Sequence, residues 1–206
     1  DIDTKFNEIK LILPSVVVKE KKSVFHVKGK ISSKEKSIDN NLLKNLFRDN
    51  IKKLRIENIN FESSSNFAFN INKKFKISEF DLKSKINLNN LDYKNDLLKI
   101  ENYLPTFKKF IRLKDHKISI NYNKNQFDIS GKGKVLIDDK LDLLNYKIKK
   151  KDNKYFFDKN INLIKNSLLI DFLNYKKEEN IKSLISLKGV YKINKKIRFD
   201  KIMLEE

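Results

Sequence analysis

Apolar and polar residues alternate with a period of two along most of this chain. In the stretch "FDISGKGKVLI" (127–137), every second position is apolar or glycine, and most of the positions between them are polar or charged. A period of two puts neighbouring side chains on opposite faces, which is typical of a half-buried β-strand. The pattern therefore predicts a protein built mainly of strands.

The same stretch contains Gly131 and Gly133 interleaved with lysines, which superficially resembles a phosphate-binding loop. Such a loop needs a strand, a glycine turn and then a helix whose free N–H groups face the anion. Here the alternation continues through both glycines, and no helical run follows. Gly29 and Gly189 also lie on apolar strand faces. We therefore interpret the glycines as sites where a sheet bends or bulges, or where a ligand or another stretch of backbone approaches closely.

Short polar connections separate the alternating segments and predict sequential antiparallel hairpins, that is, a meander. The apolar residues expected to flank these connections are Leu88 and Leu91, Ile71 and Phe75, Tyr122 and Phe127, Ile137 and Leu141, and Ile193 and Ile197. For the first pair, a two-residue turn at Asn89-Asn90 is expected.

Helical spacing is confined to two places. The first predicts a short helix within residues 40–53, and the second is the segment "YLPTFKKFIRL" (103–113). Their apolar positions are Leu42, Leu43, Leu46, Phe47 and Ile51, and Tyr103, Phe107, Phe110 and Ile111. Each would cap or cross the sheet.

The fold class expected is all-β, mainly an antiparallel meander with one or two short helices. Roughly a dozen strands are more than most open twisted sheets hold, because sheets beyond ~10 strands usually curl, split or flatten. With few helices to cover its apolar face, the sheet must fold over on itself. It becomes either a long curved β-groove or a closed β-sandwich whose inner faces pack together. We expect one groove segment over residues 1–206. Since the chain begins at Asp1, we expect a piece of a longer protein.

The candidate site is the apolar face of these strands. Its predicted lining residues are Phe25, Val27, Ile31, Phe67, Phe69, Ile71, Ile118, Ile120, Tyr122, Phe127, Ile129, Val135, Ile137, Ile185, Leu187, Tyr191 and Ile193. From the pattern alone, these side chains form either an open lining for an apolar ligand or a dry core.

The formal net charge is +19, which raises the question of nucleic-acid binding. Nearly all of this charge is lysine, and arginine occurs only at positions 48, 55, 112 and 198. Arginine is the residue that forks onto phosphates and guanine edges, so specific readout is disfavoured. A solvated lysine face with general attraction to anionic surfaces is the preferred interpretation.

Catalysis is not expected. His26 and His116 are far apart in the sequence and lie among lysines, which predicts surface positions for both. Asp138-Asp139 and Glu178-Glu179 occur in predicted turns, where carboxylates are common. There is no cysteine, nucleophile elbow or metal-ligand spacing, so we expect no cofactor and no metal. The apolar runs are too short to span a bilayer.

The second half of the chain resembles the AsmA-like family. The resemblance covers residues 100–206, as an AsmA-like C-terminal-type region. The features that carry it are Gly131-Lys132-Gly133 at the opening of a strand, Asn174-Tyr175-Lys176-Lys177, Gly189-Val190-Tyr191 and the closing Ile197-Arg198-Phe199-Asp200.

The resemblance implies a repeating β-groove that carries phospholipid between the inner and outer membranes of bacteria. Its implied partners are phospholipid acyl chains, an anionic membrane surface and neighbouring groove repeats of the parent chain. The implied location is the periplasm, with a tether to the inner membrane through a part of the parent protein outside this sequence. The alternatives are a structural or interaction β domain with a closed core and, less favoured, a basic nucleic-acid-binding module.

Overall fold

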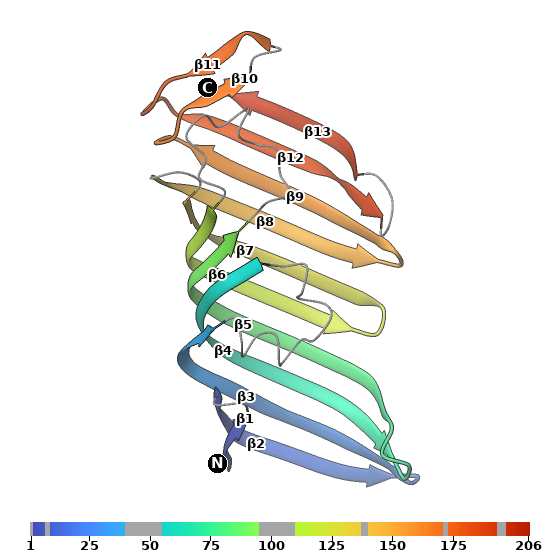
Figure 1. The fold of residues 1–206 in the computed structure, drawn as a ribbon. Coiled ribbons are helices and arrows are strands. Elements are labelled where there is room, and N and C mark those ends of the chain that lie inside the picture. The colour runs from blue at the N-terminus through green and yellow to red at the C-terminus, as the bar shows by residue number, and fades with distance from the viewer. Residues whose placement is uncertain are drawn as a thin grey trace.

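The structure, a computed structural model, describes residues 2–6, 9–39, 55–94, 110–136, 140–170, 173–192 and 197–206, and these residues form an all-β fold (Figure 1). The strands are β1 (Ile2–Phe6), β2 (Ile9–Lys21), β3 (Val24–Asp39), β4 (Arg55–Asn72), β5 (Ile77–Lys94), β6 (Phe110–Asn123), β7 (Gln126–Leu136), β8 (Leu141–Lys151), β9 (Lys154–Leu163), β10 (Leu168–Ile170), β11 (Tyr175–Lys177), β12 (Ser183–Lys192) and β13 (Ile197–Glu205).

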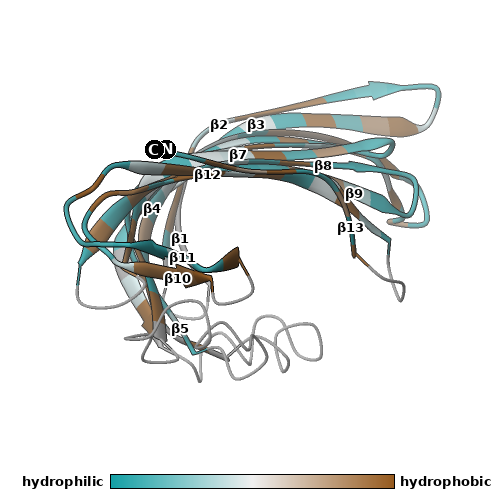
Figure 2. Ribbon diagram, turned by 90° about the horizontal axis from the view of Figure 1, so that it is seen from above, coloured by the Kyte–Doolittle hydropathy of each residue, from teal (hydrophilic) through white to brown (hydrophobic). Residues whose placement is uncertain are grey.

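Eleven of these strands form one antiparallel sheet in the order β1-β2-β3-β4-β5-β6-β7-β8-β9-β12-β13. Each strand pairs with its neighbour in sequence, except where the small β10–β11 hairpin intervenes between β9 and β12. In the described residues β1 and β13 do not pair with each other, so the sheet is not closed. The predicted all-β meander in the form of a groove is therefore confirmed, and the described strands do not form a closed sandwich. Seen along its length, the sheet curves into a trough (Figure 2).

The cross-strand register assigns each residue to one of two faces, because directly paired residues point to the same side. The β10–β11 hairpin lies within the curve of the sheet (Figure 2). Its Leu168 packs with Val135 of β7 and Leu163 of β9 in one buried cluster. The face that carries Val135 is therefore the concave one. We call it the inner face, and the opposite side the outer face.

Bulges explain why the sheet bends. Register shifts occur in β3 beside Lys34-Glu35, in β5 at Asn89, and in β6 at Asp115-His116. These positions fall close to one lengthwise row of inner-face residues, Phe61, Leu88 and His116, which pair across the strands. Since a bulge bends its strand and increases the local twist, bulges in several strands at one level curve the whole sheet.

A ring from a neighbouring strand lies over each glycine of the sheet. Phe67 covers Gly29, Tyr146 covers Gly131, His116 covers Gly133, and Phe157 covers Gly189. A methyl group at any of the four positions would collide with the overlying ring. The strand glycines therefore make room for rings of neighbouring side chains on the inner face.

A polar cluster anchors the β10–β11 hairpin at the end of the trough. The Asp142 carboxylate accepts hydrogen bonds from the backbone N–H groups of Ile164 and Lys165, at 2.9 and 3.0 Å. The Lys177 side chain, which is 0% exposed, donates to the carbonyl oxygens of Asn166 (2.7 Å), Glu178 (2.9 Å) and Ile164 (3.3 Å). Burial lowers the pKa of Lys177, while the nearby Asp142 carboxylate opposes that shift.

The predicted turn at Asn89-Asn90 is wrong. Both residues lie inside the continuous strand β5, where Asn90 pairs with Asn60 and Leu88 pairs with Phe61. Asn89 is the extra residue of a bulge, and this single insertion shifts the alternation by one. Leu88 and Leu91 therefore do share one face, as expected, but through a bulge rather than a turn.

The other four hairpins occur where the sequence predicts them, with small changes in pairing. Tyr122 pairs with Phe127 as expected. The pairs that flank the remaining three connections are Ile71 with Ile77, Leu136 with Leu141 and Tyr191 with Ile197. The helix predicted at 40–53 lies outside the described residues. The helical prediction near residue 110 is wrong for Phe110 and Ile111, which begin β6, and its other residues before β6 lie outside the described part.

Two glycine-to-alanine substitutions should destabilise the fold to different extents, because the new methyl group would meet different atoms at the two positions. At Gly189 a new methyl group would meet the Arg198 carbonyl oxygen, which is backbone, whereas at Gly131 it would meet the mobile end of the Tyr146 ring. We expect Gly189→Ala to lower the free energy of unfolding by about 1–3 kcal/mol, and Gly131→Ala to lower it clearly less. Urea unfolding with unchanged m-values measures both. A larger loss for Gly131→Ala would contradict this account.

Removal of the Lys177 ammonium should loosen the β10–β11 hairpin. Lys177→Met keeps most of the aliphatic stem but leaves three carbonyl oxygens without their donor, and we expect a cost of about 1–3 kcal/mol. Hydrogen exchange should accelerate at Leu168–Ile170 and Tyr175–Lys177. The matched control is Lys176→Met, because Lys176 is exposed and, among the described residues, forms an ion pair only with Glu178, at 2.7 Å. Equal exchange rates in the two variants would refute the anchoring role.

Candidate functional site

Fifteen of the seventeen predicted lining residues share the inner face of the trough, according to the register. The other two, Ile137 and Ile193, lie outside the described residues. Val27 and Val135 are buried, Tyr122 and Tyr191 are exposed, and the remaining eleven are half-buried. A mostly half-buried apolar face is what an accessible lining requires, since a sealed core would bury its members fully.

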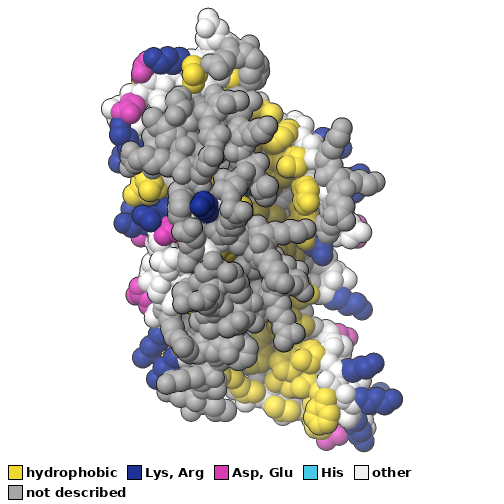
Figure 3. Space-filling view, in the orientation of Figure 1, with side chains coloured by type: hydrophobic (Ala, Val, Ile, Leu, Met, Phe, Trp, Pro, Cys, Tyr) yellow, Lys and Arg dark blue, Asp and Glu magenta, His cyan; other side chains and the backbone are white. Residues whose placement is uncertain are grey.

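The apolar residues are aligned along the trough as well as along each strand. Ile120 of β6 pairs with Ile129 of β7, which pairs with Ile148 of β8, which pairs in turn with Phe157 of β9. Adjacent strands are about 4.8 Å apart, so eleven strands extend the inner face over about 48 Å. Figure 3 shows hydrophobic side chains in a band along the length of the molecule.

Aromatic rings follow the rim formed by the hairpin tips. Their centroids are 5.8 Å apart for Phe67 and Phe69, 5.9 Å for Phe80 and Tyr122, and 6.1 Å for Tyr122 and Phe127. Rings at these separations attract one another and expose broad apolar surfaces. Lys150 interrupts the series, with its Nζ 5.9 Å from the centre of the Tyr155 ring.

Four serines replace apolar residues on the inner face of β3 to β5. The hydroxyls of Ser33 and Ser63 are hydrogen-bonded at 2.8 Å, and Ser65 donates to Ser84 at 2.8 Å. Because the hydroxyls satisfy one another, this part of the floor does not depend on water for its hydrogen bonds. Ser33, Ser65 and Ser84 are themselves buried.

Lys159 brings a positive charge to the floor of the trough. It pairs with Tyr146 of β8 and Leu187 of β12, and its Nζ lies 5.8 Å from the centre of the Phe157 ring. The side chain can be reached from the open trough, yet burial by the protein around the amine lowers its pKa. Among the described residues it forms no ion pair. Burial also raises the pKa of Tyr146 beside it.

The predicted surface position of His116 is wrong. The residue is 1% exposed and sits in the bulge of β6, where the shifted alternation turns it toward the inner face beside Gly133. Its Nε2–H donates to the Lys134 carbonyl at 2.8 Å, while Nδ1 has no hydrogen-bond partner within the described structure. Burial lowers the pKa of His116. His26 is half-buried on β3.

Part of the inner face is covered rather than open. Leu144, Ile161 and Ile185 pack against the buried cluster that includes Leu168 of the β10–β11 hairpin. The predicted lining residues Val135 and Ile185 therefore belong to a small core at the C-terminal end. The rows nearer the hairpin tips are not part of that cluster.

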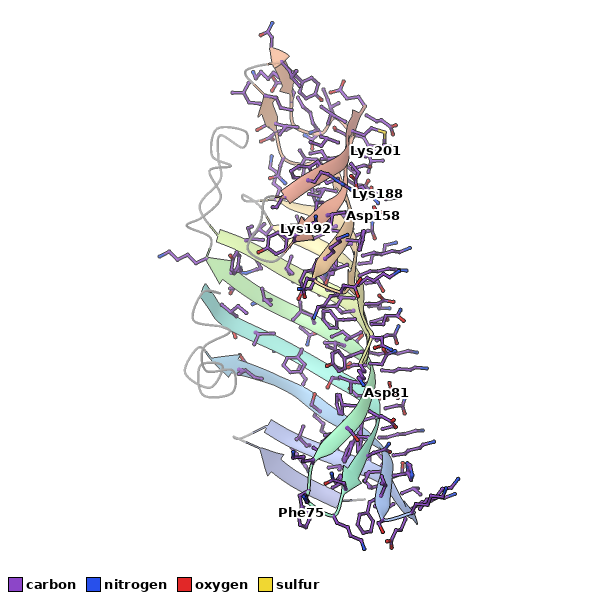
Figure 4. The ribbon with its side chains drawn as sticks, turned by 90° about the vertical axis from the view of Figure 1, so that its right-hand side faces the viewer. Phe75, Asp81, Asp158, Lys188, Lys192 and Lys201 are labelled. Carbon is purple, nitrogen blue, oxygen red and sulfur yellow. The ribbon has the colours of Figure 1, made fainter. Side chains whose placement is uncertain are left out.

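The outer face is polar. Lys85, Ser119, Ser130 and Lys147 form one row across it, and a shallow hollow of about 310 Å³ there is also lined by Lys117, Lys132 and Asp158. Figure 4 shows long side chains projecting from this side of the sheet, Lys188 among them. In the part of the chain that the structure describes, no stacking platform of aromatic residues accompanies these lysines, because the ring pairs lie on the inner face. The outer face thus has the character of a solvated lysine surface.

Comparison of the chain with protein-family models, with curated proteins and with solved structures finds no match. Within the described ranges, no group of His, Asp and Glu side chains is arranged to hold a metal ion. The described part of the chain also contains no helix with the length and apolar character needed to cross a membrane.

Several inner-face residues were not among the predicted lining. They include Leu82, Ile86, Leu88, Tyr146, Ile148, Phe157, Ile161, Phe199, Ile202 and Leu204. The period of two that identifies the others also runs through these strands. It is interrupted by Ser84 in β5 and by Lys159 in β9, which carry polar groups on an otherwise apolar face.

Stability should fall as the pH decreases below about 6.5, because His116 is held neutral in the folded state. The pKa of His116 in the folded state lies below its ordinary value of 6.5, so the unfolded chain binds the proton first and is stabilised by it. The loss of folding stability begins near pH 6.5 and ends at the pKa of the folded state. Asp115, whose pKa is lowered chiefly by its hydrogen bond with Lys134, titrates below this window.

The variant His116→Gln, which retains an amide donor for the Lys134 carbonyl, should show a shallower decline between pH 7.5 and 5.5. Urea unfolding at a series of pH values measures it. A profile in His116→Gln as steep as that of the wild type would overturn the assignment.

Proposed function

We propose that this chain is a segment of a bridge-like lipid transfer protein, in which the inner face of the trough holds phospholipid acyl chains during their movement between two membranes. The observation that supports this most strongly is the lengthwise row of apolar residues, which continues from β6 through β9 on a face that is mostly half-buried.

The energetic requirement of lipid transfer fits such a surface. Moving a two-chain lipid through water exposes on the order of 30 methylene groups at ~0.8 kcal/mol each, about 24 kcal/mol. A conduit must therefore contact the chains continuously. Half of the ~30 Å hydrocarbon core of a bilayer, about 15 Å, approximates the reach of one acyl chain. The trough is about three times longer, so a lipid would occupy a few strands at a time and advance along the row.

The polar interruptions of the inner face are compatible with this role. The four serines span neighbouring strands β3 to β5, a distance of about 10 Å at the usual strand spacing, which is shorter than an acyl chain. Lys159 and Lys150 present ammonium groups that can pair with a lipid phosphate. Lysines at the hairpin-tip rim would attract an anionic leaflet at about 1 kcal/mol each.

The two edges of the sheet fit a segment of a longer groove. In the described residues, β1 and β13 each pair on one side only, which leaves ladder hydrogen bonds that a further strand could complete. Neighbouring groove repeats of the same parent chain are the proposed partners there. The AsmA-like resemblance and the periplasmic location, with an inner-membrane tether elsewhere in the parent protein, belong to the same proposal.

A photo-crosslinking residue tests the proposal directly. Ile120 and Ser119 are sequence neighbours on opposite faces of β6. With vesicles of phosphatidylethanolamine and phosphatidylglycerol, the probe at position 120 should capture lipid, identified by mass spectrometry, and the probe at position 119 should not. Lipid capture at neither position, or equal capture at both, would refute the lipid trough and favour an interaction domain.

A block within the row should stop lipid from occupying the trough. Ile148→Glu places a carboxylate in the line of Ile129 and Phe157, and we expect at least a tenfold loss of capture at position 120, since a buried charge is strongly disfavoured. Lys149→Glu, on the outer face of the same strand, is the matched control and should retain capture. Circular dichroism verifies that both variants keep their strands. An unchanged yield in Ile148→Glu would contradict the continuous row.

A further inference from the structure

Two neighbouring hairpin tips at the N-terminal end of the trough expose apolar side chains to water. The β2–β3 and β4–β5 tips are adjacent, because Val24 pairs with Asn72 at the ends of β3 and β4. Phe75, at the β4–β5 tip, is 87% exposed, and Ile77 is 62% exposed. On the β2–β3 hairpin, Val17 and Val18 are 51% and 57% exposed. Figure 4 shows Phe75 at this end of the molecule.

The β4–β5 loop holds Phe75 in its exposed position. The Asn72 side-chain oxygen accepts hydrogen bonds from the N–H groups of Lys74 (2.9 Å) and Lys76 (3.0 Å). The Phe75 N–H donates to the Asn72 carbonyl at 2.9 Å, and Phe75 itself has a φ of 55°. A bulky residue in the left-handed region is strained, and such strain persists only where the surroundings enforce it. The loop thus keeps a strained aromatic residue directed into water.

The charge around Phe75 is strongly positive. The two tips carry six exposed lysines and two glutamates, Glu20 and Glu79. The Glu79 carboxylate accepts a hydrogen bond from Asn70. The lysines are Lys19, Lys21, Lys22, Lys73, Lys74 and Lys76. In the described part of the chain, none of the six forms an ion pair.

We propose that these two tips form a membrane-docking site that inserts Phe75 into the interface of an anionic lipid bilayer. An exposed ring framed by lysines matches that interface, where the ring enters the headgroup region and the ammonium groups remain among the anionic headgroups. The tips belong to the same rim as the β6–β7 and β8–β9 turns, at one end of the trough. Docking is independent of lipid transfer, because it needs no lipid inside the trough.

A single tryptophan reports on the site, since the chain contains none. In Phe75→Trp, fluorescence should shift to shorter wavelength with phosphatidylglycerol vesicles and clearly less with phosphatidylcholine vesicles. Phe156→Trp, on the outer face of β9, is the matched reporter and should not shift. Phe75→Ala should weaken partitioning to phosphatidylglycerol vesicles about tenfold in a sedimentation assay.

Charge reversal separates the tips from the general basicity of the protein. The variant Lys73→Glu/Lys74→Glu/Lys76→Glu should lose vesicle binding, whereas Lys147→Glu/Lys149→Glu/Lys188→Glu, with the same change in net charge, should bind markedly better. Equal binding by the two triple variants would overturn the proposal. So would the absence of a Phe75→Trp shift with phosphatidylglycerol vesicles, or an equal shift with a DNA duplex. Lipid capture at position 120 could fail without affecting any of these results.

Discussion

The antiparallel hydrogen-bond ladder between consecutive strands is the constraint on which this molecule depends. Within one strand, alternation only separates two faces. The ladder then aligns residues of the same face across strands, so that Ile120, Ile129 and Ile148 become neighbours although they are far apart in the sequence. A short apolar pattern repeated many times thereby becomes a mainly apolar face on a sheet that extends over about 48 Å. The lengthwise continuity of the inner face is a consequence of register.

Curvature arises from defects in the same ladder. The bulges at Asn89 and at Asp115-His116 bend adjacent strands at one level, and the bend turns the apolar face inward. A flat sheet of this size would expose the whole apolar face to water. The glycines contribute in a second way, because each leaves room for a ring such as Tyr146 to lie against the floor. The trough is therefore shaped by local irregularities at a small number of positions.

The distribution of polar groups distinguishes the trough from an ordinary core. The Ser65–Ser84 hydrogen bond keeps polar atoms satisfied on the inner face, whereas Lys159 retains an ammonium group there without a carboxylate partner among the described residues. At the C-terminal end, Lys177 and Asp142 anchor a hairpin that covers part of the apolar face. One molecule thus combines a covered end, an accessible middle and a rim of hairpin tips. This arrangement suits a surface that holds an apolar guest without enclosing it.

From the amino-acid sequence alone one can predict that the chain forms strands, that consecutive strands pair as a meander, and which apolar residues share a face. These properties follow from local alternation and short polar turns, which act within a few residues. Three features depend on the pairing of distant strands and are seen only in the folded structure: the bulge at Asn89, the inward position of His116, and the place of Lys159 on the apolar inner face. A bulge shifts the alternation by one residue, and its position depends on the partner strand. The open trough, too, depends on the edges β1 and β13, which do not pair with each other in the described residues.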